Sequence, residues 1–597
     1  MSEDQGENMP KSIKRKKKRS FNQMAKKMAR SRSYAGELES NAYQYMVRVS
    51  EMLRTEFPKM DDKLIFANNV YEETKGQEAD YARNQVGSRV LEILMPFANF
   101  EAIKRMLDAF QNDLRPMCSD RFSSHVLQKL ICVCVDRGNE SSDKEKDANL
   151  VKVKKGEKNQ YNEMALKLCK YVINNMEEFV WDTYANHVLR TVLECLGGLI
   201  NKPKDRKDKS GSNLVSRRIV VQSFTDLLVD SCKRMHRWPQ FQEFGKSELT
   251  SGLLQSVLHS LKDVDPELCS TIINKITNEN FASEDENKLI ALLESDSSAR
   301  LIEVCLAVSD PKTFAQIHEK YFAKKLGQLS VMRSANFCVQ RLLDNCSSRE
   351  LFEEIFDEIS NNFDMIFQRQ FGGVLVSVAN ACLRLRSKQG PFINLMMKTL
   401  HCEEAKRQKE IARLLASLAT YEKLEEARKE KKNLPLQVYG SVILQATLKF
   451  NKPIKIVNSL LEANTEDLIF IFGDSKGSWI VDTFMESEFV GEKSREKLAR
   501  KLQGYWVQLA STTHGSRSLD KIWKKVNEKQ RMVIMEELAK VGESLRSTRT
   551  GKIISANLKV PLFARSKKEW TEAQGKEGKT KALFADIIDT NLKSEDD

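Results

Sequence analysis

Glycine and proline are scarce in this sequence. Its 597 residues include 25 glycines and 12 prolines, about half of the roughly 12% that these two residues usually contribute together. Strand-rich folds need many tight turns, and tight turns depend on glycine and proline. The shortage therefore disfavours a strand-rich fold and favours helices joined by short connections.

Long apolar runs are also missing. A helix that spans a bilayer needs about 18 consecutive apolar residues, and the longest run in the first half of the chain is Leu130–Val135. The N-terminus is basic but no apolar segment follows it, which excludes a secretory signal of the usual kind. We expect no contact with a membrane.

The sequence has no recognisable catalytic or metal-binding motif. Its 12 cysteines are scattered singly among aliphatic residues, and the closest two, Cys132 and Cys134, do not have zinc-ligand spacing. They are predicted to be buried, reduced thiols of an intracellular protein. No nucleophile or metal partner accompanies His125 or His187, and no phosphate-binding glycine motif occurs. We expect neither an enzyme nor a bound cofactor or metal.

The positive charge is concentrated at the N-terminus. The formal net charge is +13, of which residues 1–33 carry +8, residues 565–597 carry −1 and the middle carries +6. The tail contains six consecutive cations: Lys14, Arg15, Lys16, Lys17, Lys18 and Arg19. Residues 1–40 are therefore predicted to form a disordered basic tail that serves nuclear import, with a non-specific contact to nucleic acid as a compatible second role.

One short pattern recurs along the chain, built around a small residue that precedes a polar pair and an apolar stretch. The small residue falls at 87, 123, 185, 250, 298, 335, 372, 440, 477, 515 and 551. Six of the ten gaps between these positions are 36 to 38 residues long. Longer gaps contain charged segments at 138–160 and 201–213, which are predicted to be solvated loops, and a polar helix end at 422–433.

This repeat predicts the fold. Each copy has room for two or three short helices, and apolar residues such as Val90, Leu91 and Leu94 follow helical spacing. Because a unit of this size cannot bury its own core, neighbouring copies must stack. We predict an all-α fold, a curved α-solenoid (superhelix) of about eleven repeats over residues 41–564, followed by a C-terminal tail at 565–597.

Three positions in each copy suggest a binding surface. Positions 1, 2 and 5 of this triplet are the first, second and fifth residues after the small residue. On a helix, positions 1 and 5 lie one turn apart on one face and position 2 lies beside them. Two side chains could then meet the edge of a base while the third stacks on it, which is the geometry for binding one base per repeat.

Several triplets have suitable chemistry. Arginine, histidine, phenylalanine or tryptophan at position 2 can stack on a base, and amides, hydroxyls or carboxylates at positions 1 and 5 can bond its edge. The candidate residues are Ser88, Arg89, Glu92, Ser124, His125, Gln128, Asn186, His187, Arg190, Arg300, Glu303, Asn336, Phe337, Gln340, Ser441, Gln445, Trp479 and Arg517. The copies whose position 1 is residue 251, 373, 441 or 552 lack a stacking group. Binding of eleven bases, one by each repeat, is therefore not expected.

The triplets and the aromatic–small dipeptides before them resemble the Pumilio (PUF) repeat family. These dipeptides are Phe122-Ser123, Tyr184-Ala185, Phe371-Gly372 and Tyr439-Gly440, and the resemblance covers residues 81–560. It implies a superhelix of three-helix repeats that binds RNA without cofactors. The length, the insertions and the basic tail look most like the divergent nucleolar Pumilio-like proteins of small-ribosomal-subunit biogenesis, with a second nucleolar Pumilio-like group as a close alternative.

The resemblance implies a ribosome biogenesis factor of the nucleus and nucleolus. It would bind precursor ribosomal RNA in the 18S region through its concave surface. The protein itself would be a monomer, with pre-ribosomal proteins as partners. By the family's pairing rules, Asn336 with Gln340 favours uracil and Ser88 with Glu92 favours guanine. A Pumilio-type regulator of messenger RNA and a protein-binding HEAT or armadillo-like solenoid remain alternatives.

Overall fold

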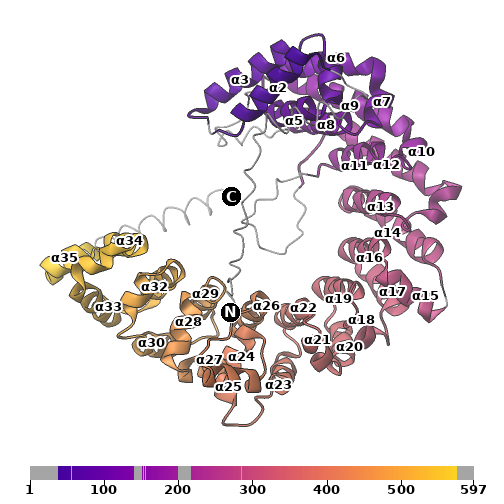
Figure 1. Cartoon of the computed structure of the whole chain (residues 1–597). Helices are drawn as coiled ribbons and strands as arrows, with labels where there is room; N and C mark the ends of the chain where they lie inside the picture. The colour runs from indigo at the N-terminus through magenta and orange to yellow at the C-terminus, as the bar shows by residue number, and fades with distance from the viewer. Residues whose placement is uncertain are drawn as a thin grey trace, which may run out of the picture. The chain divides into compact units, whose positions relative to one another are not determined.

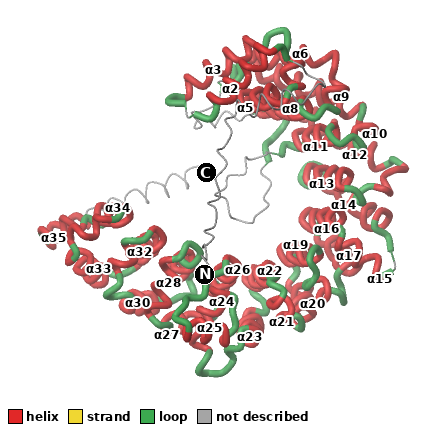
Figure 2. The backbone as a smooth tube through the Cα atoms, viewed as in Figure 1, coloured by secondary structure: helices red, strands yellow, loops and turns green. Residues whose placement is uncertain are grey.

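The protein, as seen in a computed structural model, is helical. The structure describes residues 38–574 apart from 56, 140–150, 152, 155, 200–216 and 284. Helices joined by loops make up these residues (Figure 2). The only β contact among them is an isolated bridge between Leu199 and Arg217. None of the helices in this part of the chain is long and apolar enough to cross a membrane. The chain forms two compact units, unit 1, Met1–Ala282, and unit 2, Ser283–Asp597.

Unit 1 repeats a pattern of a short helix, a helix that carries a predicted triplet, and a following helix. The triplet helices are α5 (Gln85–Leu94), α8 (Ser123–Gly138), α11 (Ala185–Leu196) and α13 (Glu248–Leu261). The short helices are α4 (Glu78–Arg83), α7 (Leu114–Cys118), α10 (Met176–Phe179) and the 3₁₀ helix η3 (Pro239–Glu243). The following helices are α6 (Phe100–Phe110), α9 (Glu157–Asn174), α12 (Gln222–His236) and α14 (Pro266–Lys275). Two more, α2 (Ser40–Met52) and α3 (Met60–Glu73), precede them.

Unit 2 has the same pattern. Its triplet helices are α16 (Asp296–Val308), α19 (Ala335–Asn345), α22 (Gly372–Arg384), α26 (Val438–Leu448), α29 (Ser478–Glu486), α32 (Thr513–Lys525) and α34 (Arg549–Asn557). The helices before them are α15 (Glu286–Glu294), α18 (Leu326–Leu329), α21 (Phe363–Gln368), α24 (Ile411–Ser417), α28 (Thr465–Gly473), α31 (Trp506–Ala510) and η6 (Gly542–Ser547). The following helices are α17 (Pro311–Tyr321), α20 (Arg349–Ser360), α23 (Gln389–Thr399), α27 (Ile454–Glu462), α30 (Glu492–Lys501), α33 (Glu528–Lys540) and α35 (Val560–Arg565).

Within each unit the triplet helices stack in chain order (Figure 1). In unit 1, α5 packs on α8, α8 on α11 and α11 on α13. In unit 2 the same contact runs without interruption from α16 to α34. The predicted all-α architecture of stacked repeats is confirmed, while the number of repeats stays a prediction.

A polar side chain fixes the start of many triplet helices. The side-chain oxygen of Asn84 accepts hydrogen bonds from the amides of Val86 and Gly87. Asp182, just before α11, accepts from the amides of Tyr184 and Ala185. In α32 the hydroxyl of Thr512 accepts the amide of Gly515. Such caps satisfy amides that have no partner inside the helix, so they set the residue at which each triplet helix begins.

In several repeats the recurring small residue allows a close approach between the triplet helix and the helix before it. A β-carbon on Gly477 would overlap the carbonyl oxygen of Ile471, six residues earlier. In α8 the small residue is Ser123, and its hydroxyl instead donates a hydrogen bond to the carbonyl of Met117, also six residues earlier, at 2.9 Å. The small residue is therefore a requirement of helix packing and sets the register of the triplet.

The structure changes the predicted limits of some segments. In the segment 138–160, Gly138 ends α8 and residues 157–160 form the first turn of α9, because apolar residues of both helices, such as Val135 and Tyr161, are buried. Residues 140–150 and the whole segment 201–213 lie outside the described residues, as does the basic tail 1–37 with Lys14–Arg19.

Helical packing continues beyond residue 564, into the predicted C-terminal tail. Residues 567–574 are helical, and Trp570 is buried. Its indole Nε1 donates a hydrogen bond to the carbonyl of Leu558 at 2.9 Å, and its ring contacts Phe563 and Trp523. The last described helical segment is thus packed on the repeats through a large buried aromatic residue.

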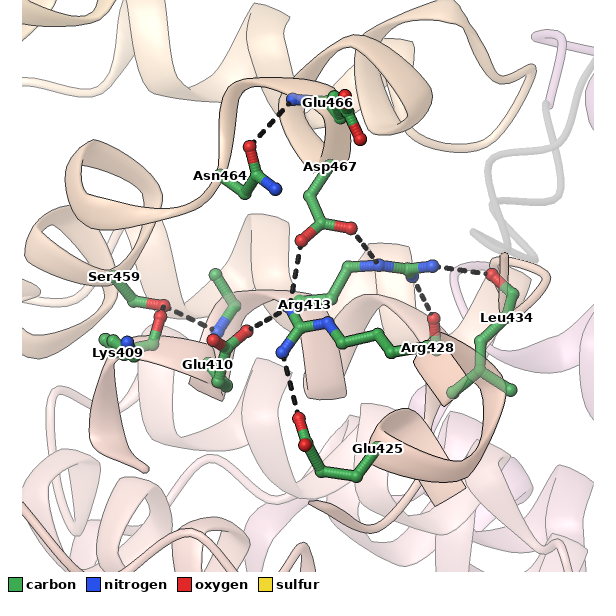
Figure 3. A network of polar contacts seen from close by, with 12 residues as sticks. Lys409, Glu410, Arg413, Glu425, Arg428, Leu434, Ser459, Asn464, Glu466 and Asp467 are labelled. Atoms are coloured by element: carbon green, nitrogen blue, oxygen red, sulfur yellow. Dashed lines mark hydrogen bonds and ion pairs between the residues drawn. The ribbon is translucent and has the colours of Figure 1, made fainter. Parts of the chain in front are cut away.

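An additional helix, α25 (Tyr421–Lys429), lies in the longest gap of unit 2, where the sequence predicted a polar helix end. Polar contacts dock it (Figure 3). The carboxylate of Asp467 on α28 bonds Arg428 of α25 at 3.0 Å and pairs with Arg413 of α24 at 3.5 Å. Arg428 also bonds Glu410 at 2.9 Å, and Arg413, which is only 2% exposed, donates to the carbonyl of Leu434. Burial alone would lower the pKa of Arg428, but its pairs with Glu410 and Asp467 raise it.

The close approach predicts different effects for two glycines of one repeat. We expect Gly477→Ala to destabilise the protein by about 1–3 kcal/mol, because the new methyl group overlaps the main chain. Nothing lies within 4 Å of a β-carbon at Gly473, so Gly473→Ala should be neutral or stabilising by up to about 1 kcal/mol. Urea denaturation followed by circular dichroism measures both changes. Equal stability of the two variants would contradict the packing role of the small residue.

The ionic network makes a second stability prediction. We expect Asp467→Asn to cost about 3 kcal/mol, because it removes the ion-pair partner of the buried guanidinium of Arg413. The matched control is Glu425→Gln, which removes a half-exposed partner of Arg428 and should cost no more than about 1 kcal/mol. Thermal denaturation compares them, and hydrogen exchange should locate the loss of protection in α24, α25 and α28. A similar small cost for both would mean that the network does not hold α25.

Candidate nucleic-acid interface

The three triplet positions differ in exposure. Position 1 is buried in almost every triplet helix, as for Ser88, Ser124 and Asn186. Position 2 is exposed at Arg89, His125, His187, Arg300, Phe337 and Trp479. Position 5 is half-buried throughout the predicted set. In these helices position 2 is therefore the most exposed of the three positions.

The position-2 side chains include large exposed aromatic rings. Phe337 is 54% exposed and Trp479 is 50% exposed. A soluble protein usually buries such rings or uses them for binding, because removing them from water is favourable. In unit 1 the corresponding residues are Arg89, His125 and His187, whose planar groups can also stack.

Partial desolvation shifts the pKa of one of these residues. Desolvation, with help from the nearby charge of Arg190, lowers the pKa of His187. The lowered pKa favours the neutral imidazole, which offers a ring face rather than a positive charge.

The position-1 amides are engaged inside the protein. Asn336 donates to the carbonyl of Met332 at 2.8 Å, and its side-chain oxygen accepts a hydrogen bond from Gln340 at 2.9 Å. Asn186 likewise donates to the carbonyl of Val180 at 2.8 Å. A contact of either asparagine with a base edge stays a prediction, and it would require the amide to exchange partners.

Position 5 lies at the seam with the next triplet helix. Gln128 of α8 accepts a hydrogen bond from Thr191 of α11 at 3.1 Å. Glu303 of α16 pairs with Arg341 of α19 at 3.5 Å. Desolvation raises the pKa of Glu303, and the charge of Arg341 opposes that rise. Sequence reasoning missed Thr191 and Arg341, because partners in neighbouring repeats carry no local signal.

Glu92, at position 5 of α5, has a similar environment. Desolvation raises its pKa, while His125 of the next helix and Lys129 lower it. The carboxylate therefore lies near the position-2 residue of the following repeat. One binding position would thus be built from two successive helices.

In repeats without a stacking residue, polar side chains of neighbouring repeats lie against the triplet. The guanidinium of Arg190 lies against Gly252 of α13, where a β-carbon would come within 2.7 Å of its Nη1 atom. Gln340 of α19 similarly approaches Gly373 of α22. In α26, Ser441 donates to the carbonyl of Lys476 at 2.8 Å and accepts from Gln445 at 3.1 Å. These polar groups hold successive helices together, and their role in base binding stays a prediction.

A second aromatic position precedes the small residue. Tyr439 is 49% exposed, and its ring lies against Gly372 of the preceding triplet helix. The sequence marked Phe122, Tyr184, Phe371 and Tyr439 only as a family signature. The structure adds Tyr439 to the exposed apolar groups at this face of unit 2.

The described residues offer no sign of a metal site. No group of three or more histidine, cysteine, aspartate or glutamate side chains in this part of the chain could hold a metal ion. The 12 cysteines are free thiols, and all but Cys132 are buried. Burial raises the pKa of several of them, to about 12 for Cys134. Such thiols are poor nucleophiles.

Comparison with known proteins gives consistent matches along nearly the whole chain. Mouse Nucleolar protein 9 is 26% identical over 583 residues, covering 92% of this chain and 91% of its own length. Pumilio homolog 23 of Arabidopsis thaliana is 22% identical, covering 93% and 75% of the two chains.

A solved structure, that of APUM23 with GGAUUUGACGG, superposes with a TM-score of 0.70 at 22% identity. It covers 90% of this chain and 99% of that chain, which shows that the two share a fold. The family model described as "NOP9-like PUF repeat domain" matches residues 76–553, well over half of the sequence. The resemblance to Pumilio repeats is therefore confirmed, and this chain belongs to the family of proteins with a NOP9-like PUF repeat domain.

Proposed function

We propose that this protein is a nucleolar RNA-binding factor of ribosome biogenesis that binds RNA along the triplet helices of each unit. The observation that carries the proposal is the row of exposed position-2 side chains at repeat spacing, including Phe337 and Trp479. Aromatic and guanidinium planes presented in this way suit unstacked single-stranded bases. A protein-binding solenoid has no need of such a row.

The relatives support the same assignment. The mouse relative is named for the nucleolus, and the structural neighbours hold oligonucleotides such as GGAUUUGACGG and GGAAUUGACGG. Because these matches cover nine tenths of this chain, we propose that it shares the role and the location of these relatives. The cations Lys14–Arg19 would direct import into the nucleus.

The finer assignment is the small-subunit precursor. The RNA bound would be precursor ribosomal RNA in the 18S region, with pre-ribosomal proteins as neighbours and the protein acting as a monomer. Its mechanism requires no catalytic step. Occupying a stretch of precursor would withhold that stretch from a nuclease or from early folding.

Crosslinking in cells tests this function. Ultraviolet crosslinking and sequencing of the bound RNA should recover ribosomal precursor around the 18S region. The same chain without residues 1–33 is the control for location, since it should lose nuclear enrichment while keeping RNA binding in vitro. Recovery of messenger 3′ ends without ribosomal precursor would contradict the assignment and favour a regulator of messenger RNA.

A substitution at α19 tests the interface. Phe337→Ala should weaken binding of the crosslinked RNA by about 1–3 kcal/mol, or roughly 5- to 150-fold in Kd, because one stacking plane is lost. Met365 of α21 is also exposed but lies outside the triplets, so Met365→Ala should leave the Kd unchanged. Fluorescence anisotropy measures both. Equal Kd values for Phe337→Ala and the unmodified protein would remove this repeat from the interface.

A further inference from the structure

The exposed tryptophan of α29 does not have both of its faces free. Arg517, the position-2 residue of α32, lies over the indole of Trp479, with its guanidinium carbon 3.4 Å from the ring centroid. This separation leaves no room for a base between the two side chains. The seam between α29 and α32 is therefore already filled by a stacked planar group.

The same arginine also engages the position-5 residue of α29. Its Nη2 atom donates to the Oδ2 atom of Asp482. One turn further along both helices, Lys521 donates to Glu486. The two ion pairs hold α32 in register with α29 and keep the guanidinium in place over Trp479.

This closed arrangement leaves acceptors of the α29 triplet unused. The Oδ1 atom of Asp482 and the hydroxyl of Ser478, at position 1, are both buried and have no hydrogen-bond partner among the described residues. Buried polar atoms normally have partners, because leaving them unpaired is costly. Arg517 thus satisfies only part of what this triplet can bind.

The contacts of Arg517 are those that a guanine base would make. A guanidinium is planar, stacks on aromatic rings and presents adjacent N–H donors to a carboxylate. The Watson–Crick edge of guanine also presents adjacent N–H donors on a planar, stacking group. Guanine would in addition reach the free Oδ1 atom, since two donors match two carboxylate oxygens.

We propose that Arg517 occupies the base subsite of α29 in the RNA-free protein as a mimic of guanine, and that a guanine of the RNA displaces it. This inference rests on the proposed RNA-binding function and adds a specificity-determining residue to it. The Watson–Crick edge of uracil has a single N–H between two carbonyl oxygens, so it offers Asp482 no adjacent pair of donors. The subsite therefore favours guanine over uracil.

Selection from a 12-nucleotide random RNA pool, followed by measurement of Kd, tests the proposal. The unmodified protein should enrich guanine at one position, and Asp482→Asn and Trp479→Ala should lose that guanine while the remaining motif persists. Arg517→Ala should bind the selected RNA about 3- to 10-fold more tightly, because the apparent affinity is reduced by the fraction of molecules whose subsite is closed.

Two controls separate mimicry from other roles of an arginine. Arg517→Lys keeps the charge but not the plane, so it should behave like Arg517→Ala. Arg300 has the same residue type at position 2 of α16 and is exposed, so Arg300→Ala should weaken binding by about 5-fold or more through loss of a stacking plane. Melting temperatures confirm that each variant is folded before its Kd is compared.

Several results would overturn the proposal. Weaker or unchanged binding by Arg517→Ala, enrichment of another base, or retention of the guanine by Asp482→Asn would each contradict it. Failure of the proposed function has a different signature. In that case the unmodified protein would enrich no motif and Phe337→Ala would have no effect.

Discussion

The contact on which much of this structure depends is the close approach of a triplet helix to the helix before it. A main-chain carbonyl occupies the space where a side chain would begin at Gly477 and Gly551. The short helix is thereby held against the first turn of the triplet helix, and its end supplies the cap for that turn, as Asp474 does for Gly477. Because this contact fixes the rotation of the triplet helix, it also decides which residues face solvent.

That rotation explains why the three triplet positions differ in burial. Position 1 follows the small residue directly, so it stays close to the preceding helix and is buried, as at Ser88 and Ser478. Position 2 is turned by a further 100° and becomes exposed. Position 5 lies one turn above position 1 and reaches the next repeat, as the pair of Glu303 with Arg341 shows. The exposure of each position therefore follows from one packing constraint.

The same constraint determines how much could be predicted from the sequence. The small residues and helical periodicity were enough for the all-α repeat, the positions of the triplet helices and the exposure of Phe337. Partners across the seams were not predictable, since Gln128 and Thr191 are 63 residues apart with an insertion between them. Burial of Trp570 and the docking of α25 by Arg428 depend on similar distant contacts. Local pattern carries no information about them.

Arg300 and Arg517 illustrate this limit. Both occupy position 2 of a triplet helix, and a sequence motif treats them alike. Arg300 is exposed, whereas Arg517 meets an indole and a carboxylate supplied by α29. The difference lies in the neighbouring helix, because a guanidinium can stack on a base or on a ring of the protein with similar chemistry. In a stacked array, the residue at one position therefore acquires its function from the repeat that precedes it.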